Sequence, residues 1–147
     1  IDAILMIGEG GTGIKPMTLP PDIPAFSGHI TPATDEMARF KGRAVLAFAG
    51  IGRPSKLFNS LRDCGALIKE SLEFPDHHPY SRKELEVIVT RCRDMQWTAV
   101  TTAKDFVRIQ SRFPELADQI TVLNITVSIE QFNRLTTLIV QKSLSRF

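Results

Sequence analysis

Ala44-Val45-Leu46-Ala47-Phe48-Ala49, followed at once by Gly50-Ile51-Gly52-Arg53-Pro54, decides how this chain folds. Six apolar residues in a row that end at a glycine are typical of a strand buried on both faces of a sheet. Pro54 suits the first turn of a helix, where a residue without an N–H loses no hydrogen bond. A buried strand that leads through a tight turn into a helix indicates an α/β fold.

The alternation of strand and helix continues along the rest of the chain. Further strands are predicted within residues 66–74, 97–102 and 120–125. Gly65 is a natural stop for the first helix, Ser81 with Glu84 forms a capping box for the second, a short third helix follows residue 102, and Ser128 is expected to cap the last. The inward side of that last helix is predicted to consist of Ile129, Phe132, Leu135, Leu138 and Ile139. Buried strands joined by helices predict a mostly parallel, Rossmann-like sheet with helices on both faces.

The first 42 residues follow a different pattern. A short apolar run at residues 3–7 predicts a buried strand. Glycines and prolines then follow one another closely, so residues 8–42 are predicted to be mostly loop, with one edge strand near residues 24–30. We therefore divide the chain into residues 1–42, the tail of an N-terminal region with an irregular linker, and residues 43–147, a C-terminal α/β domain.

The bulk properties are those of an ordinary globular chain. A length of 147 residues suits one domain, or one domain with a piece of another. The formal net charge of +2 argues neither way about nucleic acid, but no dense basic run exists to bind phosphates, so no nucleic-acid partner is predicted. Cys64 and Cys92 fall in predicted helices and are expected to be buried free thiols, consistent with a reducing compartment. No stretch approaches the roughly 20 apolar residues that span a bilayer, so we expect this chain to be soluble.

Three polar loops follow predicted strands, at the sheet edge where α/β proteins bind ligands. The most informative is Asp76-His77-His78-Pro79-Tyr80, because a carboxylate beside two imidazoles is the chemistry of a general base or a metal site. The alternative is a turn whose histidines cap the next helix or face solvent.

The other two loops also carry two readings each. In residues 50–54, Gly52 and Arg53 precede a helix N-terminus that attracts anions, although the glycines can simply permit a tight turn beside a solvated arginine. In residues 101–105, two hydroxyls, Lys104 and Asp105 gather at a strand end, although Thr102 can simply cap the next helix. Gly11-Thr12-Gly13-Ile14-Lys15 is not taken as a phosphate-binding loop, because that loop needs Gly-Lys followed by Ser or Thr.

Taken together, the three loops make the chain similar to the tetraacyldisaccharide 4'-kinase family, the lipid A 4'-kinases of Gram-negative bacteria. The resemblance rests on residues 47–54, on residues 74–80 and on Thr101-Thr102-Ala103-Lys104-Asp105, and it covers about residues 1–125. The family has Thr-Glu-Lys-Asp where this chain has Ala103 in place of the glutamate, so any role of that glutamate is lost or unneeded.

The resemblance implies an activity and roles for several residues. The family transfers the ATP γ-phosphate to the 4'-hydroxyl of tetraacyldisaccharide 1-phosphate with Mg²⁺, at the cytoplasmic face of the inner membrane. Its phosphate loop and a catalytic aspartate belong to an N-terminal region that this chain does not contain. The implied catalytic candidates are His77, Asp76 and His78, with His77 preferred. The resemblance also places Arg53 near substrate or phosphate, and Gly52, Tyr80 and Lys104 of the three loops are taken as further substrate-binding candidates.

The resemblance also sets expectations about partners. The chain is expected to be a fragment, inactive alone, that binds neither ATP nor metal by itself. Its partners are the lipid A precursor, ATP and the missing N-terminal domain, and we also consider a dimer formed through the surface that truncation exposes. Two other functions stay open at this point. One is a metal-dependent phosphoesterase of the Asp-His-His type, and the other is a non-catalytic α/β binding module.

Overall fold

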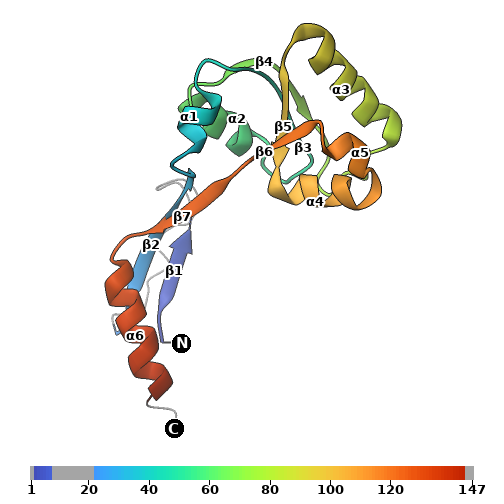
Figure 1. Cartoon of the computed structure of the whole chain (residues 1–147). Helices are drawn as coiled ribbons and strands as arrows, with labels where there is room; N and C mark the ends of the chain where they lie inside the picture. The colour runs from blue at the N-terminus through green and yellow to red at the C-terminus, as the bar shows by residue number, and fades with distance from the viewer. Residues whose placement is uncertain (1, 8–21, 145–147) are drawn as a thin grey trace. The chain divides into compact units, whose positions relative to one another are not determined.

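The computed structural model describes residues 2–7 and 22–144 (Figure 1). The glycine-rich segment with Lys15, and with it much of the predicted loop, lies outside the described residues. By internal contacts the chain forms two compact units, one of Ile1–Thr31 with Thr126–Phe147 and one of Pro32–Ile125. The division of the protein into domains after residue 42 stays a prediction.

The larger unit contains a sheet of four strands in the order β4-β3-β5-β6. All three pairings in this sheet are parallel. The strands are β3 (Ala44–Ala49), β4 (Leu67–Glu73), β5 (Thr98–Thr102) and β6 (Ile120–Leu123). The predicted parallel sheet is confirmed, and β3 pairs with a neighbour on each side.

Strand β3 carries the core of this unit. Its side chains alternate between two hydrophobic clusters, because successive residues of a strand point to opposite faces. Leu46 and Phe48 belong to one cluster, whereas Val45, Ala47 and Ala49 belong to the other. All five are fully buried, which explains why the sequence of β3 is apolar throughout and not alternating.

Helices cover both faces of this sheet, as predicted (Figure 1). The Leu46–Phe48 face packs against side chains of α3 and α4 and of the short helix α5, and the other face packs against those of α1 and α2. The helices are α1 (Glu36–Phe40), α2 (Ser55–Asp63), α3 (Arg82–Met95), α4 (Ala103–Arg112) and α5 (Pro114–Ala117).

The helix ends follow local signals in the sequence. The predicted capping box is present, since the Ser81 side chain accepts from the N–H of Glu84 and the Glu84 side chain accepts from the N–H of Ser81. Gly65 follows α2 with a φ of +76°, a left-handed conformation that glycine adopts without strain. Helix α1 was not predicted, because its stability comes from distant contacts: Glu36 is buried and accepts hydrogen bonds from the backbone and side chain of Asn124.

In the part of the smaller unit that the structure describes, there is a sheet of three strands in the order β1-β2-β7 and one helix. These elements are β1 (Ile4–Ile7), β2 (Ala25–Pro32), β7 (Ile125–Ile129) and α6 (Phe132–Leu144). The strand predicted near residues 24–30 exists, but it is central and not at the edge. The predicted burial of the first strand is wrong, because Leu5, Met6 and Ile7 are exposed at the edge of this small sheet.

The predicted start of the last helix is also wrong. Ser128 lies in β7, whose other four residues are all β-branched, a residue type that is enriched in strands. The helix begins at Phe132, after Gln131 with a φ of 56°. Of its predicted inward residues Leu135 is buried, whereas Phe132 and Ile139 are exposed.

Within the described part of the chain, no helix combines the length and the apolar character needed to cross a membrane.

The two cysteines offer a test of this core. Both are buried free thiols, and burial is the main cause that raises the pKa of Cys64 above its ordinary value and the pKa of Cys92 from 9.0 to about 11. We expect a thiol reagent at pH 8 to label both at least about 100-fold more slowly in the folded chain than in urea, because labelling then requires opening of the core.

The raised pKa of Cys92 also sets a sign for the effect of pH. Its contribution favours the folded state fully below pH 9.0 and is lost as the pH rises toward about 11, because the unfolded thiol ionises first. Cys92→Ser should therefore flatten the alkaline part of the curve of unfolding free energy against pH.

In the labelling experiment, fast labelling of both thiols in the folded chain would contradict the packing described.

Candidate active site

The three polar loops of the sequence meet at one edge of the larger sheet. They follow β3, β4 and β5, whose carboxyl ends lie side by side because the strands are parallel. Two hydrogen bonds made by the backbone of Gly50 join the loops. The N–H of His77 donates to the carbonyl oxygen of Gly50 at 3.0 Å, and the N–H of Gly50 donates to Oδ2 of Asp105 at 3.0 Å. The predicted meeting of these loops is therefore found.

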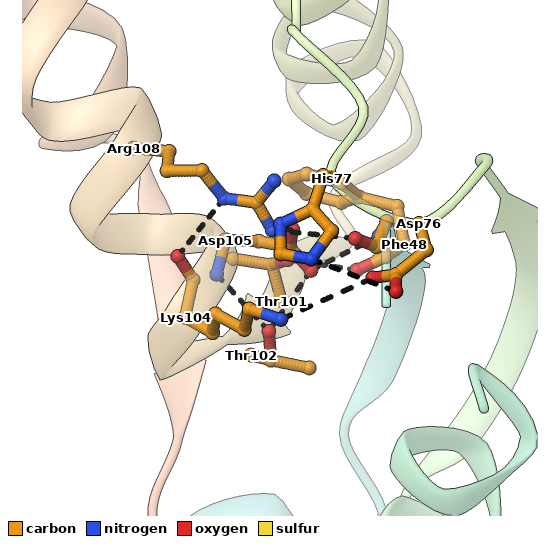
Figure 2. Close-up of polar contacts among 9 residues, drawn as sticks. Phe48, Asp76, His77, Thr101, Thr102, Lys104, Asp105 and Arg108 are labelled. Atoms are coloured by element: carbon orange, nitrogen blue, oxygen red, sulfur yellow. Dashed lines mark hydrogen bonds and ion pairs between the residues drawn. The ribbon is translucent and has the colours of Figure 1, made fainter. Parts of the chain in front are cut away.

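Asp76 lies between two cationic or ionisable side chains (Figure 2). Its Oδ2 is 3.7 Å from Nε2 of His77, and its Oδ1 is 3.9 Å from Nζ of Lys104. All three side chains face solvent, with exposed fractions of 48% for Asp76, 69% for His77 and 54% for Lys104. Both separations are too long for hydrogen bonds, and the one between Asp76 and Lys104 is that of a loose ion pair. The structure thus brings together an accessible imidazole, a carboxylate and an ammonium group.

His77 adopts a backbone conformation that is uncommon for a residue with a side chain. Its φ is 61°, in the left-handed region. This turn directs successive residues of the loop differently: the imidazole of His77 faces solvent beside Asp76, whereas that of His78 faces the core.

His78 is held by packing and by one polar contact. Its ring stacks on Phe74 at 4.7 Å between centroids and meets the edge of Tyr80 at 5.0 Å. Its Nε2 lies 3.0 Å from Oε1 of Glu84, the residue that completes the capping box of α3. With 19% of its side chain exposed, His78 connects the loop to the helix, as the alternative reading of this motif has it. Its catalytic role stays a prediction.

Tyr80 is buried and packs against Phe48 and Phe74. Burial raises the pKa of its hydroxyl, and the nearby Asp105 carboxylate adds to the rise. Among the described residues this hydroxyl has no hydrogen-bond partner. The predicted contact of Tyr80 with substrate stays a prediction.

Gly52 and Arg53 occupy the turn between β3 and α2, and both are exposed. A Cβ placed on Gly52 would lie 3.7 Å from Oδ2 of Asp76, so this glycine is near the candidate site. Among the described residues, no hydrogen bond or ion pair joins the side chain of Arg53 to Asp76, His77 or Lys104. Its role toward a substrate therefore stays a prediction.

Buried Asp105 pairs with half-buried Arg108 (Figure 2). Asp105 belongs to the third loop, but no role in the site is predicted for it from the sequence, and Arg108 is not named there. Asp105 is fully buried, and its carboxylate accepts from the Gly50 N–H, from the Thr102 hydroxyl at 2.9 Å and from Nη2 of Arg108 at 2.8 Å. Thr102 also caps α4 by accepting from the Asp105 N–H, as the alternative reading of that loop has it. The spacing from residue 105 to residue 108 is a helical i,i+3 pair, and this was the signal available in the sequence.

The described residues contain no group of three or more metal-ligating side chains. The exposed loop therefore offers its chemistry as an imidazole with a carboxylate partner, which can accept a proton, and as an ammonium group, which can attract an anion.

A sequence model of the family described as tetraacyldisaccharide-1-P 4'-kinase (LpxK) matches residues 2–143. The chain belongs to this kinase family. A tetraacyldisaccharide 4'-kinase from Paramagnetospirillum magneticum is 36% identical over 137 residues, which are 93% of this chain and 41% of that protein. Another, from Methylobacterium nodulans, is 39% identical over 133 residues, which are 89% of this chain and 38% of that protein. The resemblance stated from the three loops is confirmed.

The chain spans about 40% of the length of the curated 4'-kinases it matches, and it aligns with their C-terminal part. A solved structure supports the fold. It is the "apo" form of LpxK from Aquifex aeolicus in complex with ATP, with a TM-score of 0.57 and 21% identity, and the match covers 95% of this chain and 42% of that chain. The predicted α/β fold of the family is thus found in this chain.

The two glycines of the first loop form a matched pair for a test of the site in this kinase-family chain. A Cβ on Gly50 would lie 3.0–3.2 Å from atoms of Tyr80, His78 and Pro75, whereas a Cβ on Gly52 would meet Asp76 only at 3.7 Å or more. We expect Gly50→Ala to lower the free energy of unfolding by about 1–3 kcal/mol, because the loops cannot move apart without losing contacts. Gly52→Ala should change it by less than about 0.5 kcal/mol. Urea unfolding of both variants measures the difference, and equal effects would contradict the close approach of the loops at Gly50.

The capping box at the end of the histidine loop gives a prediction with a defined pH dependence. Hydrogen bonds from the side chain and backbone of Ser81 lower the pKa of Glu84 from its ordinary 4.5, and His78 adds to this. Glu84→Gln keeps the shape of the cap and removes the charge. We expect it to lower the melting temperature by about 2 °C at pH 7.

The difference should be present above pH 4.5 and disappear as the pH falls further, because the folded carboxylate then binds its proton. Melting curves at several pH values measure it. A difference that persists unchanged at pH 3 would show that the charge of Glu84 is not the cause.

Proposed function

We propose that this chain is the C-terminal part of an enzyme that transfers the γ-phosphate of ATP to the 4'-hydroxyl of tetraacyldisaccharide 1-phosphate. The observation that carries the proposal is the exposed group of Asp76, His77 and Lys104 at the strand ends of a chain that belongs to this kinase family. An accessible imidazole supported by a carboxylate is what the activation of a sugar hydroxyl requires.

In the proposed reaction, His77 is the general base. Its Nε2 faces the Asp76 carboxylate, which leaves Nδ1 to accept the proton of the attacking hydroxyl. The bond from the sugar oxygen to the γ-phosphorus forms, the bond from that phosphorus to the bridging oxygen breaks, and ADP leaves with the released electron pair. Asp76 stabilises the imidazolium that results, and it keeps the ring oriented. The 3.7 Å separation is expected to shorten when substrate closes the site.

Lys104 and Arg53 are proposed to contact phosphate groups. Lys104 stands beside Asp76 with most of its length exposed, so its ammonium group can approach an anion without losing a hydrogen bond. Gly52 is proposed to admit the substrate close to Asp76, since its missing side chain leaves that approach open. Tyr80 is kept as a candidate for substrate binding and His78 as a candidate for catalysis, because both pack under the histidine loop.

Phosphoryl transfer also needs a cradle for the phosphates of ATP. We propose that a preceding region of the complete protein supplies this cradle and an aspartate that works with His77. Mg²⁺ supplies charge neutralisation on the phosphates when it is bound, but the described residues form no site for it, and we assign it to none of them. The chain alone is therefore expected to turn over no substrate.

The setting of the enzyme is proposed from the same relationship. A kinase that acts on a lipid precursor is placed at the cytoplasmic face of the bacterial inner membrane. When the C-terminal part is studied alone, a dimer through the exposed apolar side chains of the smaller unit, such as Ile7, Val127 and Ile139, is a further proposal.

The test uses the complete protein that contains this chain, isolated from its source, with labelled ATP and tetraacyldisaccharide 1-phosphate. We expect transfer of label to the lipid. His77→Ala should lower kcat by about 100-fold or more, because the general base is lost, with an unchanged melting temperature. The matched control is His29→Ala, which removes a half-exposed histidine of the smaller unit and should leave kcat as it was.

Other results would decide against the proposal. Unchanged kcat in His77→Ala would remove the base, although not the kinase. A complete protein no larger than this chain, without transfer of label, would favour the non-catalytic binding module. Release of phosphate from an ester with added Mn²⁺, in place of transfer from ATP, would favour the phosphoesterase.

A further inference from the structure

We propose that Asp105 and Arg108 are positioning residues for His77, and that they act through the backbone of Gly50. Neither side chain belongs to the solvent-facing group of Asp76, His77 and Lys104. Both are hydrogen-bonded to the same glycine that holds the backbone of His77. The proposal rests on the proposed function only where it concerns the rate of phosphoryl transfer.

The backbone of Gly50 joins the end of β3 to the histidine loop and to α4. Its N–H donates to Oδ2 of Asp105 at 3.0 Å. Its carbonyl oxygen accepts from the N–H of His77 at 3.0 Å and from Nη2 of Arg108 at 3.3 Å. The same guanidinium nitrogen also donates to Oδ1 of Asp105 at 2.8 Å. The carboxylate and the guanidinium therefore hold Gly50 from both sides of its Cα atom.

Asp105 is held in a fixed position, from which it can fix the position of Gly50. It is fully buried in the first turn of α4, and the hydroxyl of Thr102, the N-cap of that helix, donates to it as well. A carboxylate that accepts hydrogen bonds from three different groups in a low-dielectric interior has little freedom to move. Arg108 is fixed in turn by donating from Nε to the carbonyl oxygen of Lys104 at 3.4 Å. Arginine suits this position because its planar fork can serve several acceptors at once.

His77 needs such support because of its backbone. A φ of 61° is unfavourable for a residue with a Cβ and persists only where surrounding contacts impose it. The hydrogen bond from the His77 N–H to Gly50 is such a contact. If Gly50 shifts, the turn can relax toward ordinary φ values, and the imidazole then leaves its place beside Asp76.

The test compares Arg108→Gln, Arg108→Lys and Asp105→Asn with the control Arg93→Gln in the complete protein. The side chain of Arg93 donates an exposed hydrogen bond to Gln119, so the control removes an arginine contact away from the loop with the same substitution. The first readout is hydrogen exchange, by mass spectrometry, of a peptide spanning residues 74–81. Pro75 and Pro79 have no amide proton, so few amides besides that of His77 contribute to it.

We expect Arg108→Gln and Asp105→Asn to speed exchange of this peptide by about tenfold or more, with no change in a peptide of β5. Arg108→Lys should give an intermediate rate, because an ammonium group keeps the charge but not the fork. Arg93→Gln should leave the exchange as it was. Unchanged exchange in both Arg108 variants, folded as judged by thermal melting, would overturn the proposal even if Asp105→Asn does not fold.

The second readout separates this proposal from the proposed function. In an active kinase, Arg108→Gln should lower kcat by about tenfold or more and leave KM for ATP within about twofold, because misplacing a reacting group affects the transition state more than binding. An unchanged kcat in an active kinase overturns the positioning role. Absence of kinase activity in the unaltered protein would count against the proposed function alone, since hydrogen exchange still decides whether Asp105 and Arg108 hold His77.

Discussion

The burial of β3 on both faces is the constraint on which the larger unit depends. Its side chains supply both hydrophobic clusters, and its two neighbours β4 and β5 are held in parallel register with it. A buried Val, Leu or Phe side chain contributes about 1.5–3 kcal/mol to folding, and a shift of the strand by one residue would move every side chain of β3 into the cluster on the other face. Because the register of β3 is thus determined, the position of Gly50 at its end is determined as well. The loops that follow β4 and β5 can then be joined to it by hydrogen bonds.

The two adjacent histidines of one loop lie in different environments. In the sequence they are equivalent neighbours, and a motif of this kind does not say which one acts. The left-handed turn at His77 gives them different environments: His78 stacks on Phe74 and contacts Glu84, while His77 faces solvent beside Asp76. A ring that is held by packing has little freedom to approach a substrate. An exposed ring beside a carboxylate has that freedom. The packing of His78 also connects the loop to the capped end of α3, so that one imidazole supports the place of the other.

Much of the larger unit could be predicted because its signals are local. The apolar run of β3, the capping box at Ser81 and the glycine after α2 each depend on a few neighbouring residues. The elements that were missed depend on distant partners. Helix α1 is completed by the contact of buried Glu36 with Asn124, 88 positions away, and Ser128 serves a strand because β7 pairs with β2. The predicted burial of β1 failed for a related reason, since an apolar run shows what a strand can bury and not what covers it.

The same distinction explains which part of the candidate site was found. Asp76, His77 and Lys104 lie in or directly after loops that follow strands, which is where α/β proteins bind their ligands. Arg108 is on the second turn of α4, and its relation to the histidine loop exists only through Gly50, which is 58 positions away. An exposed imidazole on an unfavourable turn would not keep one position by its own contacts, because solvent competes for each of them. The buried carboxylate of Asp105 is shielded from that competition, so its hydrogen bonds can transmit the rigidity of the core to a residue at the surface.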